Sequence, residues 1–67
     1  INDYNQTITL NPNFAEAYYN RGLIHKKQGD TQKAIADFKK AATLYQQQKK
    51  NDYYKDALQQ INQLQAN

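Results

Sequence analysis

Few residues in this 67-residue chain could carry out chemistry. The chain has one histidine, His25, no cysteine and six acidic side chains. Catalytic and metal sites draw on clusters of histidine, cysteine and carboxylate groups, and here none stand at a ligand spacing such as His-x-x-x-His. The two glycines, Gly22 and Gly29, are too far apart to form a Gly-rich phosphate loop. We therefore expect no enzymatic activity, no metal and no cofactor.

The composition is that of one small, polar domain. Charged residues make up 22% of the chain and hydrophobic residues 39%, with a net charge of +3. No apolar run is long enough for a membrane helix or a signal peptide, so we expect no membrane insertion and take a cytoplasmic location as the default. The mild basicity is a weak indication of acidic partners. Because the first residue is Ile1, we expect the chain to be a piece of something longer.

Apolar residues recur at helical spacing in four segments, and no segment alternates with the period of a strand. The first segment covers residues 1–10, with Ile1, Tyr4 and Ile8 on one face. Pro12 ends it, because proline disfavours helical geometry in the residue before it.

The second helix is expected to start near Asn13 and to run to Gln28. Asn13 with Glu16 three residues later resembles a capping box, and Gly29 suits a left-handed exit from the helix. The side chains expected on its inward face or beside it are Tyr18, Arg21, Gly22, Ile24 and His25. We interpret His25 as an aromatic residue packed in the core.

The third helix opens at Asp30 as N-cap and has no proline or glycine to stop it before Lys49 or Lys50. A fourth helix follows, capped by Asn51 or Asp52. Its apolar stripe consists of Tyr54, Ala57, Leu58, Ile61 and Leu64. Since short connections make neighbouring helices antiparallel, the predicted fold class is all-α, with about four helices in antiparallel pairs.

An internal repeat with a period of 34 residues is also visible. The matched pairs are Ile1 with Ile35, Asp3 with Asp37, Tyr4 with Phe38, Thr9 with Thr43, and Leu10 with Leu44. A period of this length corresponds to a helix pair with two tight turns.

With these residues, the repeat resembles the tetratricopeptide repeat family, whose pattern is Trp-x-x-Leu-Gly-x-x-Tyr, then Ala-x-x-x-Phe, then Pro. The matching residues here are Pro12, Tyr18, Gly22, His25, Ala34, Phe38 and Ala41. Two positions depart from the pattern, since Arg21 replaces the leucine and Gln46 stands where the closing proline would be. We expect Gly22 and Ala34 to let the helices approach closely, with Phe38 and Tyr18 filling the volume on either side.

The resemblance implies an α-solenoid with a right-handed superhelix. Residues 15–48 would form one complete repeat, residues 1–14 the second helix of a truncated upstream repeat, and residues 51–65 a polar capping helix. The family implies a protein–protein interaction scaffold that binds a peptide or helix of a partner on its concave face.

The side chains expected on this face are Glu16, Tyr19, Asn20, Leu23, Lys26, Lys27, Lys55 and Gln59, with Asp52, Asp56 and Asn62 continuing it along the last helix. Asn20 would bond a peptide backbone, Tyr19 and Leu23 would hold an apolar side chain, and a lysine would meet a carboxylate. Alternatively, a neighbouring repeat could cover Tyr19 and Leu23.

Two further interpretations stay open at this point. The chain could bind RNA or another acidic surface, although nucleic acid is the less favoured partner because the lysines are spread over several helical faces. Convergence of Lys26, Lys27 and Lys55 with Tyr19 in one groove would favour it. The apolar stripe of residues 1–10 could also mediate homo-oligomerisation or helix exchange, since an exposed apolar patch promotes self-association.

Overall fold

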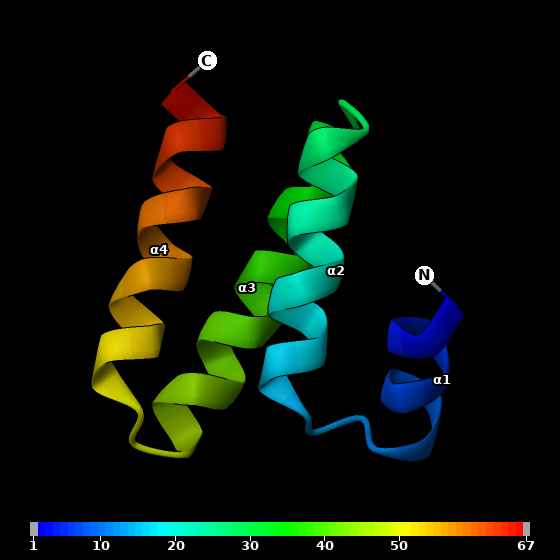
Figure 1. Ribbon diagram of the computed structural model, residues 1–67. Coiled ribbons are helices and arrows are strands. Elements are labelled where there is room, and N and C mark those ends of the chain that lie inside the picture. Colours follow the sequence, from blue (N-terminus) through cyan, green and yellow to red (C-terminus); the bar gives the residue numbers. More distant parts are fainter. Residues whose placement is uncertain (1, 67) are drawn as a thin grey trace.

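A computed structural model describes the backbone of residues 2–66 and the side chains of residues 6–66. The described part of the chain forms four helices and no strand (Figure 1). The helices are α1 (Asn2–Leu10), α2 (Ala15–Lys27), α3 (Thr31–Gln47) and α4 (Asn51–Ala66). The predicted all-α fold with four helices is therefore confirmed.

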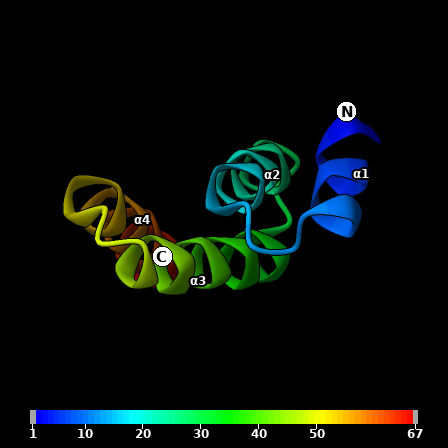
Figure 2. The same ribbon diagram turned by 90° about the horizontal axis from the view of Figure 1, so that it is seen from below.

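Consecutive helices run in opposite directions, as their short connections require. Helix α3 packs against both α2 and α4, and α1 packs against α2. Figure 2 shows α1 on the side of α2 that faces away from α4. The Cα atoms span 33 × 28 × 13 Å, so the helices form a thin slab. Such a slab leaves much of each helix open to solvent or to a neighbour.

Two small clusters of buried side chains hold the helices together. The first joins α2, α3 and α4, and its buried members are Ala15, Tyr18, Ala41, Ala42, Leu44, Tyr45 and Ala57. The second is built from Ala34, Phe38 and Ile61. Alanine makes up four of the seven buried residues in the first cluster, which lets the helices approach closely but limits the apolar area that folding removes from water.

Helices α2 and α3 are in tight contact at Gly22. The Phe38 ring, which is fully buried, lies so near the Gly22 backbone that a Cβ atom there would stand 2.9 Å from Cε1 of the ring. A side chain at position 22 would therefore displace the largest group of the second cluster. Tyr18 is also buried, as expected from its position in the sequence.

The start of α2 differs from the expectation. The helix begins at Ala15 with Phe14 as N-cap and no side-chain cap hydrogen bond, so the capping box of Asn13 and Glu16 was wrong. The reason is a turn after Pro12, in which the Phe14 amide donates to the Asn11 carbonyl at 3.1 Å. This turn holds Asn13 two residues away from the first residue of the helix.

Helices α2 and α3 end in the same backbone geometry at their C-termini. After α2, Gly29 has φ of 79°, and the Asp30 amide donates to the His25 carbonyl at 2.8 Å, which is a Schellman motif and confirms the predicted left-handed exit. After α3, Lys49 takes the same left-handed conformation with φ of 61°, and the Lys50 amide donates to the Tyr45 carbonyl at 2.9 Å.

Because this motif ends α3 at Gln47, the expectation that the helix runs to Lys49 or Lys50 was wrong. The predicted cap at Asn51 or Asp52 was also wrong, since Asn51 is already the first residue of α4. Asp30 is the N-cap of α3, as predicted, but its side chain makes no cap hydrogen bond. Its carboxylate instead lies 3.6 Å from Lys33 Nζ.

The expected stripe on the first helix lies partly outside the described residues. Ile1 and the Tyr4 side chain are not described, whereas Ile8 is half-buried and packs against the first cluster. Leu10 is 86% exposed at the end of α1.

Candidate functional site

Helices α2 and α4 both pack against α3, and two polar contacts join them to each other. The Tyr19 hydroxyl donates to Asp56 Oδ2 at 2.9 Å. About two turns further along α2, Lys26 Nζ donates to Gln60 Oε1 at 2.8 Å. These two contacts are both exposed, so the seam between α2 and α4 is accessible to a ligand.

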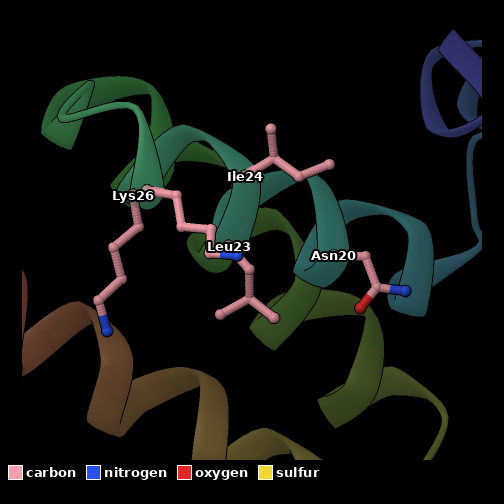
Figure 3. Close-up of a pocket in the computed structure, with 5 residues that line it drawn as sticks. Asn20, Leu23, Ile24 and Lys26 are labelled. Carbon is pink, nitrogen blue, oxygen red and sulfur yellow. The ribbon is translucent and has the colours of Figure 1, made fainter. Parts of the chain in front are cut away.

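A pocket of about 550 Å³ opens along the second half of α2. Its lining residues are Asn20, Leu23, Ile24, Lys26 and Lys27. Figure 3 shows Asn20 and Leu23 on one side of the helix, Ile24 pointing away from them, and Lys26 extending toward α4. The pocket thus combines two branched apolar side chains with an amide and two ammonium groups.

A second, smaller hollow lies at the N-terminal ends of α2 and α4. It has a volume of about 290 Å³ and is lined by Glu16, Tyr19, Asn20, Tyr45, Tyr53 and Asp56. We call it the tyrosine–carboxylate pocket. The Tyr45 and Tyr53 rings stack there with centroids 5.3 Å apart and planes inclined by 24°. Asn20 lines both hollows, so they adjoin at this residue, and we call the two hollows together the groove.

The structure brings six of the eight predicted site residues to this groove, all of them on α2. They are Glu16, Tyr19, Asn20, Leu23, Lys26 and Lys27. The two remaining residues, Lys55 and Gln59, are exposed on α4 and line neither hollow.

Two of these residues also serve the fold. Tyr19 packs edge-on against Phe38, with ring centroids 5.3 Å apart, and is half-buried. Leu23 packs against the second buried cluster. Each therefore presents only part of its surface to a ligand, because α3 and α4 cover the remainder.

Tyr45 and Tyr53 were not predicted at the site. Tyr45 lies in α3 and is 5% exposed. Tyr53 is exposed in the first turn of α4 and meets Tyr45 across the short connection of residues 48–50. A tyrosine on each side of a tight helix connection was the signal that could have revealed the pair.

The phenol groups in the tyrosine–carboxylate pocket report its electrostatic character. Burial, followed by the negative charges of Glu16 and Asp56 and the neighbouring phenols, raises the pKa of Tyr45 to about 12. Burial and the hydrogen bond to Asp56 likewise raise the pKa of Tyr19. Both phenols stay protonated because this corner of the molecule disfavours additional negative charge.

A partly buried ion pair joins α2 to α3. Arg21 donates two hydrogen bonds to Asp37, from Nε at 2.9 Å and from Nη2 at 2.7 Å. Asp37 is buried. The hydrogen bonds to it, and then its negative charge, raise the pKa of Arg21 despite partial burial of the guanidinium group. The arginine in place of the expected leucine is therefore matched by an acid on α3.

His25 belongs to the same cluster. Its Nε2 lies 3.5 Å from Asp37 Oδ2, while its Nδ1 is buried without a hydrogen-bond partner. Together with the packed environment of α2 and α3, this placement fits a structural role for the histidine.

Searches of the described residues for other kinds of site gave two results. Among residues 6–66, whose side chains are described, no three histidine or acidic side chains come together in a way that could hold a metal ion. Over the same range, no helix combines the length and apolar character needed to cross a membrane.

Comparison with protein families identifies the repeat. Residues 15–48 match the tetratricopeptide repeat, and this range covers half of the chain. The chain belongs to the tetratricopeptide repeat family, whose repeats are generally protein–protein interaction modules and are typically non-catalytic. Searches of curated proteins and of solved structures gave no match.

Proposed function

We propose that the groove between α2 and α4 binds an extended segment of a partner protein. The observation that carries this proposal is that Asn20 lines both hollows, with apolar side chains such as Leu23 in one and two carboxylates in the other. Asn20 would bond the backbone of the bound segment, and Leu23 would contact one of its apolar side chains. Lys27, which is exposed at the end of the groove, would meet an acidic group.

The arrangement of the repeat supports this assignment. In the proposal, residues 15–48 form the complete repeat, residues 1–14 the second helix of an upstream repeat, and residues 51–65 a capping helix. The first helix of each pair, α2 and then α4, lines the concave face of the superhelix.

The test is affinity capture of partners with the full-length protein, quantified by mass spectrometry. The variant Asn20→Ala with Lys27→Ala should lose its partner, because both groups face the groove and neither belongs to the buried clusters. Gln32→Ala with Lys39→Ala is a matched control, since it removes an amide and an ammonium group from the exposed surface of α3. Equal capture by both double variants would contradict the proposal.

Nucleic-acid binding is less well supported by the placement of the charges. Tyr19, the aromatic residue that would stack on a base, donates to Asp56 and shares its pocket with Glu16. Two carboxylates beside that ring would repel a phosphate backbone. Lys26 and Lys27 line the neighbouring hollow, and Lys55 lines neither, so the three lysines do not converge on Tyr19.

We also propose that two copies of the chain associate through α1. Leu10 is almost fully exposed and Phe14 is 42% exposed, which leaves apolar surface at this end of the slab. Light scattering at increasing concentration should show a rising average mass, and a constant monomer mass would refute this idea. Leu10→Gln should lower the association without affecting the groove.

A further inference from the structure

The sequence of α1 matches the face of α3 that packs against α2. The 34-residue internal repeat aligns α1 with the middle of α3, so that Asp3 matches Asp37 and Leu10 matches Leu44. In each helix the aspartate and the leucine are seven positions apart, which is about two helical turns. The two positions of each pair therefore share one face of their helix.

In α3 this face is covered by α2. The Asp37 carboxylate accepts two hydrogen bonds from Arg21, and Leu44 belongs to the buried cluster that also contains Ala15 and Tyr18 of α2. As a result, Asp37 is 6% exposed and Leu44 is 4% exposed. The packing of α2 on α3 thus combines an apolar contact with an ion pair on the same face.

In α1 no helix of the described part of the chain covers the corresponding face. Leu10 is 86% exposed, whereas Ile8, two positions earlier and on the opposite side of the helix, packs against the first cluster. Figure 2 shows α2 on one side of α1 and no helix on its other side. Helix α3 packs against the helix before it and the helix after it, whereas α1 packs against α2, the helix after it. The contact that α1 lacks is therefore the one that α3 makes with α2.

A second copy of the chain offers no matching helix for this face. The sequence contains one arginine, Arg21, and in the folded chain it is bound to Asp37. Helix α4 repeats the spacing of α2 with a shift of 36 residues, yet it has Ala57 at the position of Arg21 and Leu58 at the position of Gly22. The helix that fits the open face of α1 is therefore not one of the four described here.

We propose that the open face of α1 binds a partner helix that resembles α2 and carries an arginine, which pairs with Asp3, followed by a glycine. The arginine follows from the match of Asp3 with Asp37, and the glycine from the match of Tyr4 with Phe38, whose ring lies against Gly22. An amphipathic helix laid on an apolar face is a recurring mode of recognition. This face lies on the side of α2 away from α4, so the proposal is independent of the groove.

The first test uses the wild-type chain and two capped synthetic peptides. One has the sequence of residues 13–28, which includes Arg21 and Gly22, and the other has the same sequence with Arg21→Leu. In a titration followed by amide NMR, the arginine peptide should shift the signals of α1 and bind at least threefold more tightly than the leucine peptide. Absence of binding, equal binding of the two peptides, or shifts confined to α3 or to the groove would overturn the proposal.

The second test removes one charge from the chain. Asp3→Asn should abolish the preference for arginine, so that the two peptides bind with the same affinity. Asp52→Asn removes the same charge from the exposed first turn of α4 and should retain the threefold preference. A preference that persists in Asp3→Asn would refute the pairing with Asp3. Circular dichroism verifies that both variants are folded.

Discussion

The ring of Phe38 lies directly on the backbone of Gly22, with space for a hydrogen atom but not for a methyl group. Phe38 is fully buried between α2, α3 and α4, so the ring cannot move away without disturbing the second cluster. The glycine is therefore required by packing in the middle of a helix, where glycine is otherwise about 1 kcal/mol less favourable than alanine.

Gly22→Ala should destabilise the chain despite its better helix propensity. Overpacking costs roughly 1–3 kcal/mol and exceeds the propensity gain, so we expect a net loss of about 1 kcal/mol in urea denaturation. In the Phe38→Leu background, which relieves the clash, the same substitution should be neutral or stabilising. Additive effects of the two substitutions would contradict the contact.

Arg21→Leu restores the residue expected from the family pattern but should destabilise this chain. It leaves the buried Asp37 carboxylate without its two strongest hydrogen bonds, at a cost of about 1–3 kcal/mol. Arg21→Leu combined with Asp37→Ala removes both charges and should recover most of that loss. Thermal unfolding at neutral pH measures both effects, and a double variant less stable than Arg21→Leu would argue against the pairing.

Gly29 and Lys49 both have a left-handed backbone conformation, so adding a side chain at one and removing it at the other should change stability in opposite directions. Lys49→Gly should stabilise the chain by roughly 0.5–1 kcal/mol, because a non-glycine residue is strained at φ of 61°. Gly29→Ala should destabilise it by about 1 kcal/mol for the same reason, although the space around Gly29 is open. Chemical denaturation of the two variants should therefore move the midpoint in opposite directions.

The raised pKa of Tyr45 predicts that the folded chain loses stability at alkaline pH. Its pKa of about 12 in the folded chain lies above the ordinary value of 10.0, so the folded state holds this proton more tightly than the unfolded state. The stability that this protonated tyrosine contributes to the folded state is fully present below pH 10 and declines as the pH rises from 10 toward 12. Tyr45→Phe should lack that part of the decline, so the difference between the two curves measures it. Parallel curves would disprove the shift.

The helices could be predicted because their apolar residues recur at helical spacing, and the match of Gly22, Ala34 and Phe38 indicated the family. The helix ends were less predictable, since they depend on backbone turns rather than on side-chain type. The turn after Pro12 separates Asn13 from the helix that it was expected to cap. Lys49 adopts a left-handed conformation that its side chain does not favour, so no sequence signal indicated the end of α3.

Some residues of the candidate site could likewise be predicted from the sequence, whereas others could not. The residues of α2 could be assigned to the groove because one helical face contains them all. Tyr45 and Tyr53 could not, because their stacking depends on how the short connection aligns two helices. The pairing of Arg21 with Asp37 was not predicted, because the two residues lie 16 positions apart on different helices and meet only once α2 packs on α3.

The bidentate contact of Arg21 with Asp37 makes α2 and α3 mutually dependent. A helix transplanted from a family member with leucine at the position of Arg21 would bring no cation to the acid on α3. Engineered chimeras of this protein should therefore transfer both helices as one cassette, with the junctions placed in the connections before Ala15 and after Gln47.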